Sequence, residues 1–275
     1  MRIGIIGLGL MGGSLGLALK NVSFVTQVFG LDHNAFHEKE AVELGLIDKI
    51  VTHDQIQTCD IIFLTIPVEG IIATLHSFTK VPSQTTIIDF GSTKDKIVNN
   101  IPKNLRENFV AAHPMAGTEK FGPSAAFASL YTNKVVALCD LEASGKHQRE
   151  LAIKVFEELN MRIITMNAKD HDLHAAYISH LPHVISYALA NSVLAHEDTK
   201  TILNLAATGF KDMSRLAKSS PNMWGDIFKQ NRDNVIETIT IFEQELASLK
   251  KQLQNNEWDT LHEKMSHANS LHDIL

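Results

Sequence analysis

The chain has 275 residues, of which 44% are apolar and 20% are charged, and its formal net charge is -6. This length allows one large domain or two ordinary ones with ample core, and we expect two. The negative net charge argues against general nucleic-acid binding, so an anionic ligand must be held by local charges. The two cysteines, Cys59 and Cys139, have no metal-binding spacing and give no sign of an oxidising compartment.

The apolar start of the chain is not expected to be a signal peptide. Five glycines lie between residues 4 and 13, the basic start is a single arginine, and no small-residue cleavage site precedes polar sequence. No segment has the length and apolarity of a membrane span. We therefore expect a cytoplasmic protein that does not associate with membranes.

Between residues 2 and 166, short β-rich runs alternate with helical stretches. In chain order the runs are RIGIIG, TQVFGLD, DIIFLTIP, TTIIDF, NFVAAHP, KVVALC and RIITMN. Continuous apolar strands are typical of sheets that are buried on both faces, which predicts a mostly parallel sheet flanked by helices. We therefore predict an α/β domain of the Rossmann type over residues 1–166.

The first of these runs leads into a glycine motif. Gly7, Gly9 and Gly12 follow the strand and precede a helix that is predicted to run to about Lys20. In a dinucleotide site the first glycine permits a tight turn, the second lets the backbone approach a pyrophosphate, and the third lets the helix pack on the strand. The N–H groups at the start of the helix then face the phosphates. The expected cofactor contacts in this turn are Gly7, Leu8, Gly9, Leu10, Met11 and Gly12.

The next run ends in an acidic residue, Asp32, twenty positions after Gly12. A carboxylate at this place hydrogen-bonds the adenosine ribose hydroxyls and repels a 2′-phosphate, and the following residues HNA include no arginine to accept one. We therefore expect NAD rather than NADP. The alternative is a glycine-rich turn that binds nothing.

Polar segments follow three later runs: LTIP at residues 64–67, DFGSTK at 89–94 and HPMAGTEKFG at 113–122. Ligands of open α/β sheets bind at the carboxyl ends of the strands. The side chains expected to converge there, on the nicotinamide end, are Thr65, Pro67, Ser92 and His113. Pro114 favours extended geometry at His113 and hence a strand end. Taken singly, Ser92 is more often a helix cap, and His113 is equally well a buried, hydrogen-bonded histidine.

After Asn167 the β-branched runs stop and helical patterns take over. We predict helices over residues 168–196, over KDMSRLAK, and from Pro221 to about residue 254, which together make an all-α domain over 167–275. Apolar residues recur every seven positions along the last helix, a seam that needs a partner. We expect a homodimer through these helices, with packing on the chain's own helices as the alternative. The seam residues are Phe228, Val235, Phe242 and Leu249.

Four histidines in the first of these helices invite comparison with a metal site. At about 100° per residue, His171 and His174 point away from His180 and His183 on a regular helix, so the four could share one ion only if the helix were distorted at Pro182. No metal is expected.

These segments together resemble the prephenate dehydrogenase family, which also includes the arogenate and cyclohexadienyl dehydrogenases of tyrosine biosynthesis. The resemblance covers nearly the whole chain, and its last three segments are far more specific than the glycine motif. It is carried by GLGLMGGSLGLAL, DFGSTK, HPMAGTEKFG, SHLPH and GFKDMSRLAKSSPNMW.

The resemblance implies the oxidative decarboxylation of a cyclohexadienol, in which NAD takes hydride from the ring carbon that bears the hydroxyl, carbon dioxide leaves, and the ring becomes aromatic. By this resemblance His113 accepts the hydroxyl proton, and Ser92 orients that hydroxyl beside the nicotinamide. A neutral imidazole suits the role, and such a base contributes about 10²–10⁴-fold.

The resemblance also implies a substrate pocket. The substrate carries two carboxylates, and Arg215 matches the family's substrate-binding arginine, whose guanidinium donates two parallel hydrogen bonds. By resemblance, His183 helps to form the pocket, and Thr118 and Glu119 belong to a loop at its mouth. Trp224 is expected in the core or at an interface, with an edge on the pocket as the alternative.

Other functions remain open. A 3-hydroxyacid dehydrogenase has a similar glycine-rich start, but it uses a lysine in a glycine-rich helix, where this chain has SHLPH. A non-catalytic NAD-sensing protein needs neither the histidine base nor the arginine. Within the family we favour prephenate, which gives 4-hydroxyphenylpyruvate, over arogenate or dual specificity, because prephenate dehydrogenases are the more frequent.

Overall fold

The computed structural model describes residues 1–118 and 120–274, apart from the side chain of Leu203. It divides into two units, Met1–Asn231 and Arg232–Leu275. The first contains the sheet and several helices, and the second is helical. The fold class is therefore as predicted, and the domain boundary after residue 166 stays a prediction.

Each of the seven β-rich runs forms a strand. The sequence did not indicate β3, which has only two residues and so no readable alternation. The strands are β1 Arg2–Ile6, β2 Gln27–Leu31, β3 Lys49–Ile50, β4 Ile61–Leu64, β5 Thr86–Asp89, β6 Phe109–Pro114, β7 Val135–Cys139 and β8 Arg162–Met166.

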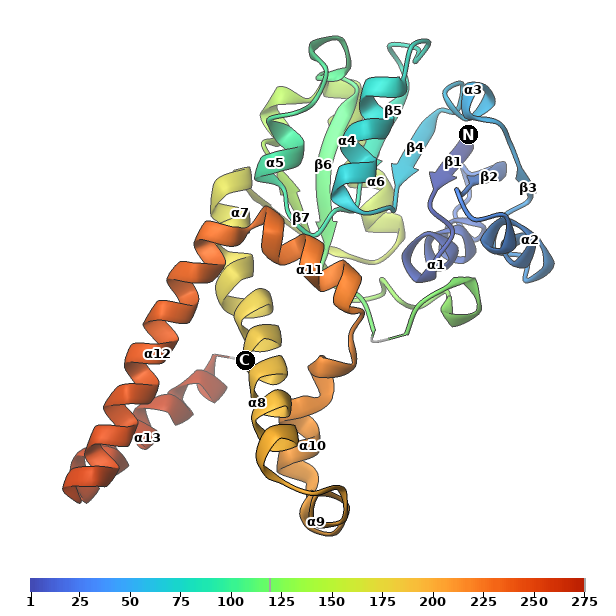
Figure 1. Cartoon of the computed structure of the whole chain (residues 1–275). Helices are drawn as coiled ribbons and strands as arrows, with labels where there is room; N and C mark the ends of the chain where they lie inside the picture. Colours follow the sequence, from blue (N-terminus) through green and yellow to red (C-terminus); the bar gives the residue numbers. More distant parts are fainter. Residues whose placement is uncertain (119, 275) are drawn as a thin grey trace. The chain divides into compact units, whose positions relative to one another are not determined.

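These strands form one sheet in the order β3-β2-β1-β4-β5-β6-β7-β8 (Figure 1). All neighbouring pairs are parallel except β6 and β7, which are antiparallel. The strand order reverses between β1 and β4, and this is the point at which open α/β sheets bind ligands. The predicted mostly parallel sheet is confirmed.

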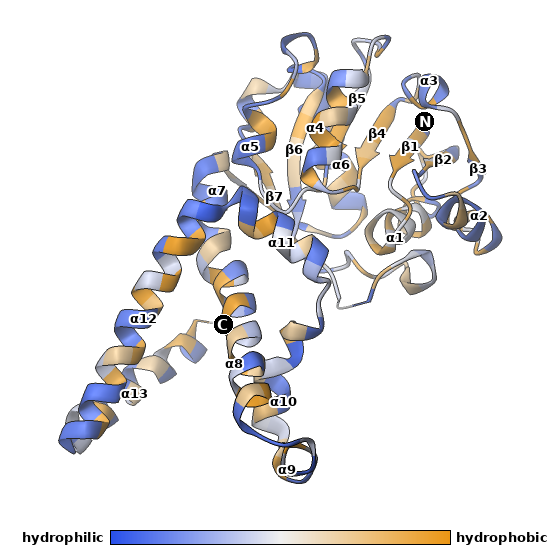
Figure 2. Ribbon diagram, viewed as in Figure 1, coloured by the Kyte–Doolittle hydropathy of each residue, from blue (hydrophilic) through white to orange (hydrophobic). Residues whose placement is uncertain are grey.

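Helices cover both faces of the sheet, because successive residues of the strands point to opposite sides. In β4, for example, Ile61 and Phe63 join one apolar cluster and Ile62 and Leu64 join the other. Figure 2 shows the strands mostly in the colours of apolar residues, while apolar and polar residues mix along helices such as α4 and α5. The helices of this part are α1 Leu10–Leu19, α2 Ala35–Glu43, α3 His53–Ile56, α4 Val68–Ser77, α5 Asp95–Val98 and α6 Lys146–Glu158.

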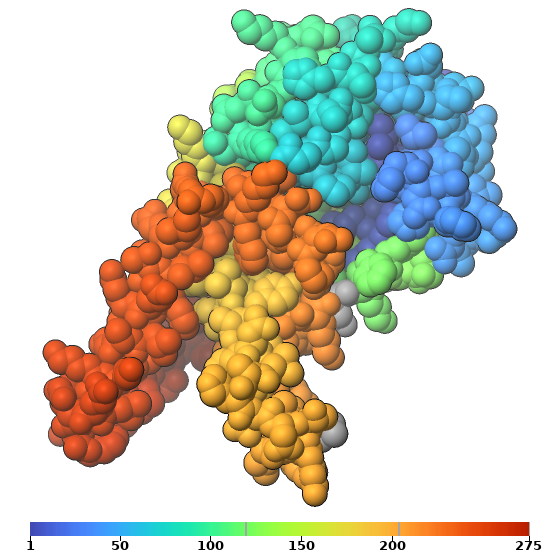
Figure 3. Space-filling view, viewed as in Figure 1, coloured from blue at the N-terminus to red at the C-terminus, as the bar shows by residue number. Residues whose placement is uncertain are grey.

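The rest of the first unit is helical. The helix predicted over residues 168–196 is present, but a π-helical turn at Ala176–His180 interrupts it, a feature that often marks functional sites. Figure 3 shows the end of α8 with α9 and α10, in yellow and orange, extending away from the α/β part. The helices are α7 Ala168–Ala175, α8 Leu181–His196, α9 Thr199–Leu205, α10 Thr208–Ser214, the 3₁₀ turn Arg215–Lys218 and α11 Pro221–Gln230.

The prediction of one continuous helix from residue 221 to about 254 is wrong. α11 ends at Gln230, and α12 (Arg232–Asn255) begins after Asn231. The physical reason is tertiary, because the Asn231 side-chain amide donates to the Asp172 carbonyl oxygen at 2.6 Å. Asparagine is a weak helix former, and this hydrogen bond holds Asn231 outside the helix. The apolar periodicity of the sequence does not reveal such a bond.

The second unit is a pair of helices, α12 and α13 (Trp258–Asn269), followed by a 3₁₀ turn at Ser270–Asp273. Lys264 on α13 pairs with Glu245 on α12 at 2.7 Å. In the described part of the chain no helix has the length and apolarity needed to cross a membrane.

A buried ion pair lies beneath the carboxyl edge of the sheet. Asp89, the last residue of β5, and Lys94 are both fully buried, and the ammonium donates to the carboxylate and to the Ala112 carbonyl oxygen at 2.7 Å. The other carboxylate bonds come from the main chain of Gly91 and Ala112. Burial raises the pKa of the Asp89 carboxyl, while the charge of Lys94 opposes that shift.

Replacing Lys94 by Met leaves the Asp89 charge buried without its partner, so we expect the free energy of unfolding to fall by about 3–5 kcal/mol. Denaturant unfolding of the variant measures this loss. The double variant Lys94→Met, Asp89→Asn should recover much of it, and Lys96→Met, at a partly exposed position, should lose little. A single Lys94→Met variant as stable as the wild type would contradict the importance of the pair.

Candidate active site

The glycine turn leaves space for a ligand at one position only. Gly7 has φ 98°, which favours glycine, and a Cβ on Gly12 would lie 1.8 Å from the Gly7 carbonyl oxygen. A Cβ on Gly9, by contrast, would meet no atom within 4 Å. Gly9 is also the N-cap of α1, where it offers no side chain to cap the first N–H groups. The turn therefore fits a phosphate group at the start of α1.

Asp32 is bonded to the same turn. Its carboxylate accepts hydrogen bonds from the N–H groups of Leu8 at 2.7 Å and Asn34 at 2.8 Å. His33 and His37 place their Nδ1 atoms 3.2 and 3.6 Å from the two carboxylate oxygens. A carboxylate has about four acceptor positions, two of which the main chain occupies, so it retains capacity for ligand hydroxyls.

The remaining residues expected to contact the cofactor differ in which of their atoms a ligand can reach. Leu8 and Leu10 are buried, so their main chain alone is available to a ligand, and Met11 is half-buried, with its carbonyl oxygen accepting from Tyr131 at 2.7 Å. The Thr65 hydroxyl lies 2.6 Å from the Gly7 carbonyl oxygen, where it ties the end of β4 to the glycine turn. Pro67 is exposed at the N-terminus of α4.

Ser92 lies between β5 and α5 and does not cap a helix. α5 begins at Asp95, and its N-cap residue is Lys94. The Ser92 side chain is half-buried, and its hydroxyl has no hydrogen-bond partner among the residues that the structure describes. It is therefore available to a ligand at the carboxyl edge of the sheet.

His113 lies near the end of β6, half-buried, as expected for a strand end at that edge. Its Nδ1 is 2.9 Å from Nε2 of His171, and Nδ1 of His171 is 2.8 Å from the Asp172 carboxylate. Burial lowers the pKa of His113 well below the ordinary histidine value, and nearby His171, Lys94 and His180 add to that effect. The imidazole is therefore neutral at physiological pH.

Sequence reasoning did not identify His171 and Asp172 as parts of this site. The histidine spacing suggests only a metal site for His171, and no motif points to Asp172. The usable signal was periodicity, because Ala168, His171, Asp172 and Ala175 form the buried face of α7. Polar side chains on a buried face need partners inside the protein.

A second group of rings surrounds Trp224 on α11. His183 stacks on the indole with ring centroids 3.5 Å apart, and His180 meets it edge-on at 5.9 Å. Burial lowers the pKa of His180 to about 4 and also lowers that of His183, which the charge of Arg215 lowers further. Trp224 is buried, and its indole N–H has no partner among the described residues. The group therefore offers neutral rings and a free donor.

Arg215 begins the 3₁₀ turn after α10 and is exposed, close enough to His183 to affect its pKa. Thr118 is also exposed, and its hydroxyl accepts from the Lys120 N–H at 3.2 Å. No contact within the described residues joins Thr118 to Arg215 or His183. Glu119 lies outside the described residues. Among those described, no group of three or more His, Cys, Asp or Glu residues could hold a metal ion.

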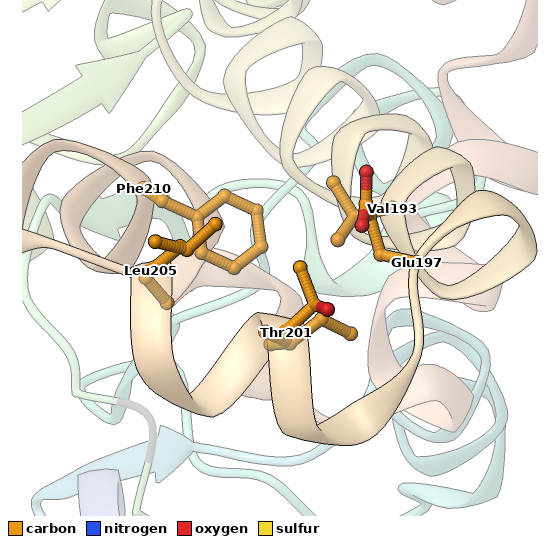
Figure 4. Close-up of a pocket in the computed structure, with 7 residues that line it drawn as sticks. Val193, Glu197, Thr201, Leu205 and Phe210 are labelled. Atoms are coloured by element: carbon orange, nitrogen blue, oxygen red, sulfur yellow. The ribbon is translucent and has the colours of Figure 1, made fainter.

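An apolar hollow of about 220 Å³ lies elsewhere, among α8, α9 and α10. Figure 4 shows Phe210 and Leu205 on one side of it and Val193 on the other. Val193 is ten residues, or about 15 Å of helix, beyond His183. Its lining contains one ionisable side chain, Glu197, so the hollow offers little chemistry of its own.

Comparison with known proteins gives two family matches. Residues 15–165 match "Prephenate dehydrogenase, nucleotide-binding domain", and residues 167–267 match "Prephenate dehydrogenase, dimerization domain". A cyclohexadienyl dehydrogenase of Zymomonas mobilis is 32% identical over 267 residues, which cover 94% of this chain and 91% of the relative.

Solved structures agree with these matches. A prephenate dehydrogenase of Aquifex aeolicus, crystallised with hydroxyphenyl propionate and NAD+, has a TM-score of 0.92 and 30% identity, covering 99% of this chain and 97% of its own. An arogenate dehydrogenase of Synechocystis has a TM-score of 0.80 and 28% identity, covering 99% of both chains. These three relatives carry three different substrate names.

Two glycine variants separate the fold of the turn from its ligand. Gly9→Ala should unfold at the temperature of the wild type, because its Cβ enters open space, but should weaken NAD+ binding at least tenfold, because that space is where a pyrophosphate would lie. Gly12→Ala should lower the melting temperature, since overpacking costs about 1–3 kcal/mol. Thermal melts and NAD+ titration measure both. Unchanged NAD+ affinity in Gly9→Ala would move the phosphate site elsewhere.

Proposed function

The chain belongs to the prephenate dehydrogenase family, and we propose that it catalyses the NAD-dependent oxidative decarboxylation of prephenate to 4-hydroxyphenylpyruvate in tyrosine biosynthesis. The observation that supports this most directly is the position of His113, a neutral imidazole at the carboxyl edge of the sheet, on the strand next to the one that leads to Ser92. A base for a hydroxyl proton belongs at this edge, beside the dinucleotide site.

NAD fits the residues at the turn. The open position at Gly9 admits a pyrophosphate, the start of α1 supplies N–H groups, and the Asp32 carboxylate suits ribose hydroxyls while repelling a 2′-phosphate. When bound, NAD supplies the hydride acceptor. The prephenate dehydrogenase of Aquifex aeolicus was crystallised with this dinucleotide.

In the proposed reaction His113 accepts the proton of the substrate hydroxyl as the hydride leaves the same ring carbon. The Ser92 hydroxyl orients that hydroxyl. The ring carboxylate then leaves as carbon dioxide, its bonding electrons complete the aromatic ring, and the resulting phenolate oxygen takes the proton back from His113. No water or further oxidant is required, so the protein's part is to orient the alcohol and hold one proton.

Arg215 is the proposed partner of a substrate carboxylate. A planar guanidinium donates two parallel hydrogen bonds to a carboxylate, and in this structure its exposed position leaves those donors available. His183 and Trp224, one of which stacks on the other, form the wall beside it. Thr118 and Glu119 are proposed to lie at the mouth of the pocket, on the sequence resemblance alone.

We propose a homodimer formed by the helical part of the chain. Residues 167–267 match a dimerization domain, and large apolar side chains are exposed along these helices. An interface between two copies of the chain would remove these side chains from water. The exposed apolar side chains include Ile178, Leu194, Leu205 and Met213 in the first unit and Ile236, Leu246, Leu253 and Trp258 in the second.

One assay tests the reaction. NADH formation is followed with prephenate, with arogenate and with 3-hydroxyisobutyrate, while NAD+ binding is measured without substrate. We expect the highest kcat/KM with prephenate. A higher value with arogenate would change the substrate and keep the family chemistry. Turnover of 3-hydroxyisobutyrate alone, or NAD+ binding without any turnover, would contradict the proposal.

Replacing His113 by Asn removes the proposed base and keeps a polar side chain. We expect kcat to fall at least about a hundredfold, since a positioned base contributes about 10²–10⁴-fold, while NAD+ affinity stays the same. Steady-state kinetics and NAD+ titration measure the two effects. Turnover close to that of the wild type would remove His113 from the base position.

Replacing Arg215 by Ala should chiefly raise KM for prephenate. Hydrogen bonds to charged groups contribute about 1.5–3 kcal/mol, which corresponds to roughly a ten- to hundredfold increase. Lys218→Ala, at an exposed basic position on the same 3₁₀ turn, is the matched control and should change KM little. Equal effects of the two substitutions would indicate general electrostatic attraction instead of a specific contact.

A further inference from the structure

Two buried polar side chains, His171 and Asp172, form a hydrogen-bonded chain behind the proposed base. His113 Nδ1 lies 2.9 Å from His171 Nε2, and His171 Nδ1 lies 2.8 Å from the Asp172 carboxylate. His171 is 3% exposed and Asp172 is 4% exposed, so water does not compete for these bonds. The chain connects the end of β6 with the first turns of α7.

The direction of these bonds follows from the carboxylate. An ionised carboxylate only accepts, so the hydrogen on His171 must be on Nδ1. In a neutral imidazole the other nitrogen is then an acceptor, and His171 Nε2 takes the hydrogen on Nδ1 of His113. His113 Nε2 is left with a free lone pair, which is the form that a base needs.

We propose that His171 and Asp172 are positioning residues of the reaction: they hold His113 in the tautomer whose Nε2 accepts the substrate proton, and they support the imidazolium that results. This inference rests on the proposed function, in which His113 is the base. His171 and Asp172 do not touch the substrate in this scheme and act through His113 alone.

The carboxylate is itself fixed by the main chain. Asp172 accepts from the N–H of Lys94 at 2.7 Å and from the N–H of Asp95 at 3.0 Å. These two residues follow Ser92 by two and three positions. The same carboxylate therefore sets the segment that carries Ser92 and, through His171, the ring of His113. Such a shared anchor keeps two groups in one geometry.

The chain also supports the charge that appears during the reaction. When His113 takes a proton at Nε2, its Nδ1–H still points to His171, and the Nδ1–H of His171 still points to the Asp172 anion. The other charged group that faces the ring is Lys94, whose charge Asp89 balances, and His180 is a neutral neighbour. In a buried site an anion one imidazole away stabilises the imidazolium more than it would in water.

Two substitutions at His171 separate positioning from simple packing. In His171→Gln the amide oxygen can still accept from His113 Nδ1, so we expect kcat within about tenfold of the wild type. His171→Leu removes the acceptor, leaves the His113 Nδ1–H without a partner and favours the other tautomer, so kcat should fall at least about a hundredfold while KM for NAD+ is unchanged. His174→Leu, at an exposed position of the same helix, is the control and should behave as the wild type.

The outcomes are distinguishable. If His113→Asn retains wild-type turnover, the proposed function fails, whatever His171 does. If His113→Asn is inactive but His171→Leu retains kcat, or if Gln and Leu at position 171 reduce kcat equally, the positioning role is overturned. If His171→Leu does not fold, nitrogen NMR of the wild-type imidazoles decides: a hydrogen on Nδ1 of His113 supports the proposal, and a hydrogen on Nε2 overturns it.

Discussion

The edge of the sheet that carries the candidate active site depends on one buried carboxylate. Asp172 lies on α7, after the last strand of the sheet, yet it accepts hydrogen bonds from the main chain at the start of α5 and from His171. A buried anion with fewer donors would be strongly destabilising, so the protein folds only in an arrangement that brings these segments together. α7 is thereby joined to the segment after β5 by directed polar bonds, which fix position more closely than apolar packing does.

A second buried hydrogen-bond network is centred on Asp89 and Lys94. The Asp89 carboxylate binds the Lys94 ammonium and two main-chain N–H groups, and the ammonium also binds a carbonyl oxygen of β6. The ends of β5 and β6 are therefore held together at the point where their loops leave the sheet. Lys94 belongs to both networks, since its side chain meets Asp89 and its main chain meets Asp172. The place of Ser92 between these anchors follows directly from the two networks.

The parts of the fold that were predictable are those set by local sequence. Gly7 and Gly12 are required by backbone geometry within a few residues, and the apolar runs mark strands whichever neighbours they pair with. The position of His113 and Ser92 at one edge follows from the general rule for parallel sheets. By contrast, the helix break at Asn231 and the link from His171 to His113 depend on contacts between residues 58 or 59 positions apart. Helix periodicity contains no information on such contacts.

The histidine rings of the candidate site are neutral. This explains why the Asp172 carboxylate lies behind the proposed base, His113, and not beside it. His113, His180 and His183 all have a pKa lowered first by burial, so the exposed Arg215 is left as the cation for the proposed substrate, which carries two carboxylates. An acidic side chain next to the proposed base would repel that substrate and would hold the imidazole in its protonated form. Placed one imidazole further away, Asp172 avoids both effects. It still lies close enough to stabilise the charge that appears only when the proton arrives, and stabilisation confined to that moment accelerates a reaction without strengthening ground-state binding.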